Sequence, residues 1–206
     1  MNTPNKVLTA QARESLKGKW RVPVKVTALY LLINLVLRFV PIVGSIGAFI
    51  ITGPFMVGIA IYFLSFSRNE APKYTRMFEG FHMWPRALGT YLLKNLYIFF
   101  WSLLLIIPGI IAAYSYSQVF YILAEDKNIT TVDALQKSKD IMKGNKWKLF
   151  GLQCRFIGWA ILCILTAGIG LLWLFPYMQT AFAKFYDDIK NTSTGEAITT
   201  PEVVTV

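Results

Sequence analysis

Three long apolar segments dominate the pattern of hydrophobic and polar positions along the chain. Residues 39–67, 95–124 and 156–183 contain no Asp, Glu, Lys or Arg. Each segment is longer than the roughly 20 residues that a helix needs to cross a bilayer. Each is also interrupted by Pro or Gly, at Pro41 with 44–47 in the first segment, at Pro108-Gly109 in the second and at 166–170 in the third. Because Pro and Gly are where a membrane helix can turn, we expect every segment to fold as a hairpin.

These hairpins predict an all-α, polytopic membrane protein with six transmembrane helices. They are expected near residues 21–42, 47–67, 85–107, 109–125, 146–166 and 170–188. The alternative is four crossings, in which the second and third segments cross only once. With the N-terminus in the cytoplasm, six helices keep every Lys and Arg except Arg38 inside, whereas four carry the basic segment 127–155 outside. Since Lys and Arg are concentrated in cytoplasmic loops, we predict six crossings with both termini cytoplasmic.

A short phrase recurs before each hairpin. "ARESLKGKW" at 12–20 and "SKDIMKGNKWKLF" at 138–150 share an amphipathic segment, a Lys-Gly step and a Trp beside basic residues, and "RMFEGFHMWPRALG" at 76–89 is a weaker copy. The phrase predicts a pseudo-threefold repeat of about 63 residues, each copy being an interfacial amphipathic helix followed by a hairpin. The single membrane domain, 1–188, then divides into repeats near 6–68, 69–126 and 127–188. The polar residues 189–206 are expected to form a disordered cytoplasmic tail.

The ends of the predicted interfacial helices carry recognisable capping residues. Gly18, Gly80 and Gly144 are expected to end these helices in a left-handed conformation. Thr130 with Asp133 resembles a capping box that begins the third of them.

Composition supports the membrane class. Hydrophobic residues make up 55% of the chain and charged residues 16%, and the mean hydropathy is +0.48. Soluble domains usually carry about a quarter charged residues. A net charge of +10 could indicate nucleic-acid binding, but no recognition motif accompanies it. We therefore expect basic loops that face anionic lipid, and no nucleic-acid partner.

Two groups of basic and aromatic residues are candidate lipid sites. Trp and its basic neighbours after each amphipathic segment are predicted to be interface anchors, because Trp lies at headgroup depth and Lys or Arg reaches anionic lipid. These anchors are Lys17, Lys19, Trp20, Arg21, Trp84, Arg86, Lys143, Lys146, Trp147 and Lys148. Three further cations, Lys25, Lys94 and Arg155, lie inside predicted spans. They are expected either to snorkel or pair with carboxylates at the inner helix ends, or to bind a phosphate headgroup. The candidate carboxylates are Glu70, Glu125, Asp126, Asp187 and Asp188.

Polar residues in the spans form a third candidate group. They are Asn34, Asn95, Tyr114, Gln118 and Gln179, with Gln153 nearby in the fifth predicted helix. Such residues either join helices by hydrogen bonds or line a path for a ligand. Gly109, Ala113 and Ser117 form a ladder of small residues that favours close helix packing.

Catalytic chemistry is not indicated. The only histidine, His82, falls in a predicted loop, and the sequence has no HExxH, CxxC, GxSxG or Walker motif. We therefore predict no enzyme, no metal and no cofactor. The leading hypothesis is a non-enzymatic membrane protein that binds anionic lipid or a membrane partner in cell-envelope maintenance or regulation. The alternatives are a small-molecule permease or exporter with a polar path between the hairpins, and an accessory or receptor subunit of a membrane complex.

Several phrases together resemble an uncharacterised bacterial membrane family, domain of unknown function 975. They include the two phrases above and "FFWSLLLIIPGIIAAYSYSQVFYILAED" and "FIGWAILCILTAGIGLLWLFPYMQTAFAKFYDD". The chain also looks related to the membrane region that accompanies some glycerophosphodiester phosphodiesterases. The resemblance covers residues 10–188 and implies a multi-pass protein of the bacterial cytoplasmic membrane. The catalytic barrel of those phosphodiesterases is absent, so their activity and catalytic residues do not carry over.

Overall fold

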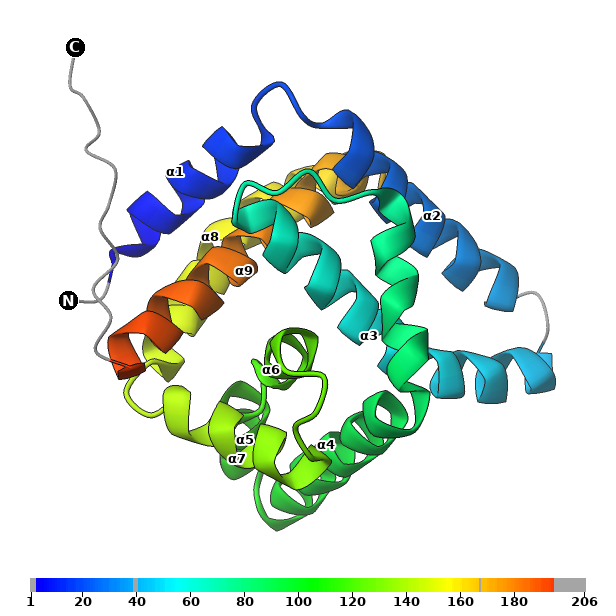
Figure 1. Cartoon of the computed structure of the whole chain (residues 1–206), viewed down its shortest axis with the longest axis vertical. Helices are drawn as coiled ribbons and strands as arrows, with labels where there is room; N and C mark the ends of the chain where they lie inside the picture. The colour runs from blue at the N-terminus through cyan, green and yellow to red at the C-terminus, as the bar shows by residue number, and fades with distance from the viewer. Residues whose placement is uncertain (1–2, 39–40, 167, 195–206) are drawn as a thin grey trace.

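The computed structural model describes residues 3–38, 41–166 and 168–194 (Figure 1). Within these ranges the chain is helical and has no strand, so the all-α prediction is confirmed. The elements are α1 (Asn5–Leu16), α2 (Arg21–Arg38), α3 (Pro41–Ser67), η1 (Tyr74–Met83, a 3₁₀ helix), α4 (Trp84–Leu104), α5 (Ile106–Ser115), α6 (Val119–Glu125), α7 (Thr131–Ile141), α8 (Lys146–Leu165) and α9 (Leu171–Thr194). Residues 189–194 belong to α9, so the predicted tail does not begin at 189, and 195–206 lie outside the described residues.

The turns between paired helices differ in part from the prediction. α3 begins at Pro41, so the expected turn at 44–47 is helical. Proline suits the first helical position because its missing N–H would have no intrahelical partner there. The second turn falls at Leu105, whose backbone is extended. Pro108 lies in the first turn of α5, where its missing N–H likewise leaves no helical hydrogen bond unmade. The third turn lies in 166–170 as predicted, with Gly168 at a φ of 84°.

Two of the three predicted glycine helix ends are confirmed. Gly18 has a φ of 76° and Gly144 a φ of 77°, the left-handed region in which glycine alone is unstrained. Gly80 does not end a helix. It lies inside η1, where a Cβ atom would collide with the carbonyl oxygen of Pro54, and a Cβ at Gly58 would collide with the carbonyl of Met77. These two glycines therefore let the backbones of η1 and α3 come into direct contact.

The core of the molecule is built from the second helix of each pair. Figure 1 shows α6 near the centre, with α1, α2, α4 and α7 at the edges. α3 packs against both α6 and α9. The largest fully buried side chains of these three helices are Tyr62, Phe63, Ile122, Leu123, Phe185, Tyr186 and Ile189. Aromatic and branched side chains of these inner helices thus exclude water from the centre of the fold.

The outer helices expose large apolar side chains. Leu103 of α4 is 73% exposed, Ile106 of α5 is 77% exposed, and Trp159 of α8 is 60% exposed. α2 and α9 contribute further exposed residues, namely Leu32, Leu35, Val36 and Trp173. Soluble monomers rarely expose large apolar patches, so these surfaces need a covering of lipid or protein.

Two segments of the described chain could cross a membrane by length and composition. They are Ile50–Ser67, within α3, and Ile106–Glu125, which α5 and α6 cover together with a break between them. These segments support a membrane protein. They do not confirm six crossings or the orientation of the termini.

Candidate functional site

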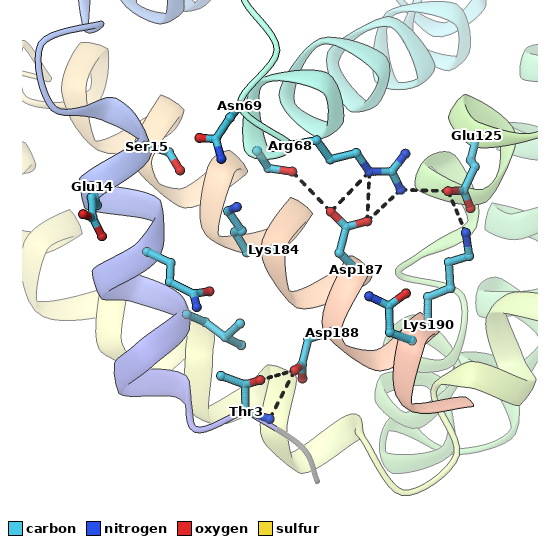
Figure 2. A pocket seen from close by; sticks show the side chains of 14 residues that line it. Thr3, Glu14, Ser15, Arg68, Asn69, Glu125, Lys184, Asp187, Asp188 and Lys190 are labelled. Carbon is cyan, nitrogen blue, oxygen red and sulfur yellow. Dashed lines mark hydrogen bonds and ion pairs between the residues drawn. The ribbon is translucent and has the colours of Figure 1, made fainter. Parts of the chain in front are cut away.

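The carboxyl ends of α3, α6 and α9 meet in one ion-paired network (Figure 2). The Arg68 guanidinium, just after α3, lies 2.7 Å from both Glu125 Oε1 and Asp187 Oδ1. The Lys190 ammonium lies 2.8 Å from Glu125 Oε1, and the Tyr186 hydroxyl donates to Glu125 Oε2 at 2.8 Å. Burial lowers the pKa of Arg68, but hydrogen bonds and the charges of Asp187 and Glu125 outweigh it and raise that pKa above its usual value. The network joins the ends of α3 and α6 to the last third of α9, and the carbonyl dipoles at the two helix ends favour nearby cations.

A second group of polar contacts fixes the start of the chain to the same end of the molecule. Asp188 is 2% exposed and forms an ion pair with Lys148 at the start of α8. The Thr3 backbone N–H and hydroxyl both donate to Asp188, and the Asn5 side chain donates to the Lys148 carbonyl at 2.8 Å. A cavity of about 690 Å³ lies between α1 and these helix ends, and Figure 2 shows the side chains that line it. Three acidic groups of the lining, Glu125, Asp187 and Asp188, are paired with cations, so this cluster first of all holds the helices together.

The predicted partners of the three cations inside the spans were wrong. Glu125, Asp187 and Asp188 do form ion pairs, but with Arg68, Lys148 and Lys190, and Glu70 pairs with Arg76. None of the described ion pairs includes Lys25, Lys94 or Arg155. The reason is geometric: all these carboxylates lie at the ends of the inner helices, whereas Lys25 and Arg155 lie exposed on the outer helices α2 and α8.

Most of the predicted interface anchors lie at the surface. The exposed ones are Lys17, Lys19, Arg21, Trp84, Arg86, Lys143 and Trp147, and the partly buried ones are Trp20, Lys146 and Lys148. Trp147 is 81% exposed, as an aromatic anchor requires. Lys148 is not available as an anchor, because its ammonium is committed to Asp188. Arg86 donates to the carbonyl of Lys127, which ties α4 to the segment before α7.

An apolar groove with a basic end lies between α5 and α8, and its volume is about 610 Å³. Its wall is made by Ile107, Ile110, Ile111, Tyr114, Trp147 and Phe150, and its basic end by Lys143, Gly144 and Lys146. The Phe150 ring packs against both Trp147 and Tyr114, with centroids 5.6 and 6.3 Å apart. From Ile107 to Tyr114 the wall runs about 10 Å along α5. The groove, which we call the α5–α8 groove, is therefore an elongated apolar surface with two ammonium groups at one end; Lys143 also pairs with Asp140 at 2.8 Å.

A second, smaller cavity lies at the centre of the bundle, between α3, α4, α5, α6, α8 and α9. We call it the central cavity; its volume is about 300 Å³. Its polar lining includes Tyr91, Lys94, Ser117, Gln118, Tyr121, Gln153 and Gln179.

The hydrogen bonds around the central cavity orient its polar groups. Tyr121 donates to Gln179 Oε1 at 3.2 Å, and Tyr114 donates to Gln153 Oε1 at 2.5 Å. The Gln118 Nε2 donates to the Ser117 hydroxyl at 3.0 Å, while the Gln118 Oε1 is buried and has no hydrogen-bond partner.

Gln118 reaches the central cavity because the helix is broken there. α5 ends at Ser115 and α6 begins at Val119. The Ser115 hydroxyl donates to the Ile111 carbonyl at 2.8 Å, and the Ser117 hydroxyl donates to the Tyr114 carbonyl at 2.8 Å. Serine side chains that bind nearby carbonyls compete with the helical ladder. The phrase "YSYSQ" at 114–118 thus contains a local signal for this break, which was not among the predicted turns.

The structure brings together part of the predicted polar path. Gln118 and Gln179 line the central cavity, and Tyr114 is joined to its wall through Gln153. Asn95 is exposed and does not line it, and the side chain of Asn34 lies outside the described part. Of the cations inside the predicted spans, Lys94 lines the cavity and Lys25 and Arg155 do not. Among the described residues, no group of three His, Cys, Asp or Glu is placed to hold a metal ion.

Fold and sites together define an all-helical protein with candidate membrane spans, an apolar outer surface and an interior cavity that has several polar groups in its lining. A model of the family described as "Protein of unknown function (DUF975)" matches residues 1–108 and 103–193, so the chain belongs to this uncharacterised family. The resemblance to that family is confirmed, and no comparison supports the further likeness to glycerophosphodiester phosphodiesterases. No curated protein and no solved structure matches the chain.

Proposed function

We propose that the protein crosses the membrane six times, through α2, α3, α4, the α5–α6 pair, α8 and α9. The exposed apolar side chains of α2, α4, α5 and α8 support this topology, because lipid is the covering that such outer surfaces need. The membrane is the bacterial cytoplasmic membrane, with both termini and the paired ends of α3, α6 and α9 in the cytoplasm. This orientation leaves nearly all Lys and Arg inside.

The proposed topology also includes three structural repeats. Each begins with a short helix, α1, η1 or α7, which lies at the cytoplasmic interface and precedes a helical hairpin. The inner helices of the three hairpins converge at Arg68, Glu125 and Asp187, as expected if they surround a common pseudo-threefold axis.

Within that membrane, the protein is a non-enzymatic binder of anionic lipid, with a role in cell-envelope maintenance or regulation. The observation that carries this proposal is the α5–α8 groove, where an apolar wall ends in Lys143 and Lys146. An acyl chain fits the apolar wall, and a phosphate headgroup then lies beside the two ammonium groups. Trp147, at the same end, lies at the depth that membrane-interface tryptophans prefer.

Selectivity in this groove comes from the headgroup. Lipid tails are as apolar as the protein wall, so contact with a tail gives little preference for one lipid over another. Each Lys near an anionic membrane surface contributes about 1 kcal/mol, so two contribute about 2 kcal/mol. Because about 1.4 kcal/mol is a tenfold change in affinity, we expect roughly a thirtyfold preference for an anionic lipid over a zwitterionic one.

Native mass spectrometry of the purified protein tests this proposal. The protein is exchanged into equal amounts of phosphatidylglycerol and phosphatidylcholine, and the retained lipids are counted for three forms. The wild type should retain phosphatidylglycerol preferentially, and Lys143→Gln with Lys146→Gln should lose most of that preference. The matched control is Lys17→Gln with Lys19→Gln, which removes the same charge at the corresponding phrase of the first repeat. Equal loss in the control would show that total charge, and not the groove, selects the lipid.

A permease is the second candidate function, and the central cavity favours it because a transported solute needs a polar site at mid-depth. Under this proposal the cavity opens alternately to the two sides of the membrane. An accessory or receptor subunit is a third possibility, and cross-linking in native membranes tests it by showing whether a stable protein partner is captured.

A further inference from the structure

The central cavity contains a positive charge that its lining does not balance. Lys94 lines the cavity, and none of the residues that line it is Asp or Glu. The Lys94 ammonium lies 4.8 Å from the centre of the Phe120 ring, a contact that stabilises a cation without neutralising it. Lys94 is ten residues beyond Trp84, the first residue of α4, which places it about 15 Å along the helix. With Trp84 at the membrane interface, as proposed above, that distance exceeds the reach of a lysine side chain, so snorkelling does not explain the position of Lys94.

A buried acceptor lies in the same cavity. Gln118 is 2% exposed, and its Oε1 has no hydrogen-bond partner in the described structure. Buried polar atoms are nearly always paired, and an exception calls for a physical explanation. A donor on a ligand would supply the missing partner once the Gln118 amide turns toward the cavity, because the oxygen itself has almost no accessible surface.

The other two glutamines are oriented as donors. Tyr121 and Tyr114 donate to the Oε1 atoms of Gln179 and Gln153, so the Nε2 groups of both glutamines are left to donate. The central cavity therefore offers an ammonium group, two amide donors and one amide acceptor. The charged side chain in the described lining is the Lys94 ammonium, as in a site for an anion.

We propose that the central cavity binds a small carboxylate or phosphate monoester that also carries a hydroxyl or amine donor. Lys94 neutralises the anionic oxygens, Gln153 and Gln179 donate to them, and Gln118 accepts from the ligand's own donor. The volume of about 300 Å³ matches a small molecule, at the lower limit of known ligand sites. The site is separate from the α5–α8 groove, with the Tyr114–Gln153 hydrogen bond joining their walls, so it stands or falls independently of lipid binding there.

The test measures the charge preference of the cavity with thiol reagents. Ser117→Cys places a thiol in the lining, in a background where Cys154 and Cys163 are replaced by Ala. The protein, in phosphatidylcholine nanodiscs, is treated either with anionic 2-sulfonatoethyl methanethiosulfonate or with its cationic trimethylammonioethyl analogue. The rate at which each reagent modifies the cysteine is divided by the rate at which it modifies a free thiol in solution. We expect the anionic reagent to be favoured at least tenfold and the preference to disappear with Lys94→Gln. Lys25→Gln, the matched control outside the cavity, should leave it unchanged.

Protection by added anions then identifies the source of the ligand. Slower modification with inorganic phosphate or glycolate assigns the site to a soluble anion. If modification slows only when the nanodisc contains phosphatidic acid, the site is assigned to a lipid headgroup with the same chemistry. Ala113→Cys, at a second lining position, replaces Ser117→Cys if that variant does not fold. The proposal is overturned if neither thiol reacts, if the preference survives Lys94→Gln, or if none of the three anions protects.

Discussion

Glu125→Gln gives the sharpest test of the network at the ends of α3, α6 and α9. Both carboxylate oxygens of Glu125 are used: Oε1 accepts from Arg68 and Lys190, and Oε2 accepts from Tyr186. Glutamine keeps the shape but removes the charge, and its Nε2 must then face one of these donors. Hydrogen bonds to charged groups contribute about 1.5–3 kcal/mol and neutral ones about 0.5–1.5 kcal/mol, so three partners lose about 3 kcal/mol together.

Solvent reduces that figure. The Glu125 side chain is 21% exposed and that of Arg68 is 39% exposed, so water screens part of the interaction. We expect a net loss of about 2 kcal/mol in the free energy of unfolding. For a chain of this size, that corresponds to a fall of roughly 4–8 °C in the midpoint of thermal unfolding.

Thermal unfolding of the detergent-solubilised protein, followed by intrinsic tryptophan fluorescence, measures this loss. The matched control is Asp140→Asn, which removes one carboxylate charge from the exposed pair with Lys143 and should lower the midpoint by less than about 1 °C. If the two substitutions lower the midpoint equally, the network does not hold the inner helices together, and the proposed convergence of the three hairpins loses its main physical support.

The same unfolding assay checks three further predictions. Gly58→Ala forces a Cβ against the Met77 carbonyl and should lower the free energy of unfolding by about 3 kcal/mol. Its control, Gly158→Ala, lies in open space on α8 and should change that free energy by less than about 1 kcal/mol. Similar effects of the two substitutions would disprove the close contact of η1 with α3. Gly144→Ala must adopt a left-handed conformation and should cost about 1–2 kcal/mol, and a neutral result would contradict the observed helix end. Thr130→Ala loses the hydroxyl that accepts from the Asp133 N–H and should cost about 1 kcal/mol, and no change would mean that this cap is not needed.

The helix order could be predicted from the sequence because it depends on local signals. Apolar segments, Pro and Gly interruptions and the Lys-Gly phrase located nearly every helix, and the left-handed Gly18 and Gly144 followed from the same phrase. The position of the second turn could not be predicted so well. Proline suits both the turn between two helices and the first turn of the second helix, so Pro108 could occupy either position. The packing of α5 on α4 decides between the two positions.

The sites depended on contacts between distant segments, which a single sequence does not contain. Gln118, Gln179 and Lys94 each stand out in an apolar setting, but their meeting in one cavity requires the second and third hairpins to pack together. Arg68 was not singled out as a partner for Glu125 and Asp187, because nothing local relates residues that are 57 and 119 positions apart. The phrase around Gly80 predicts a helix end because it matches the other two, whereas the role of Gly80 comes from its contact with α3.

The break between α5 and α6 divides one candidate membrane span into two pieces with different main neighbours. α5 packs on α4, where a Cβ at Gly109 would collide with the Ser102 side chain, and α6 packs on α3. Rotation about the backbone bonds of residues 116–118 would tilt α5, as one arm, relative to α6, against the contacts that hold α4 on α3 and α5 on α4 and α8. Gln118 lies at the base of that arm, so the same rotation would move its side chain within the central cavity that it lines.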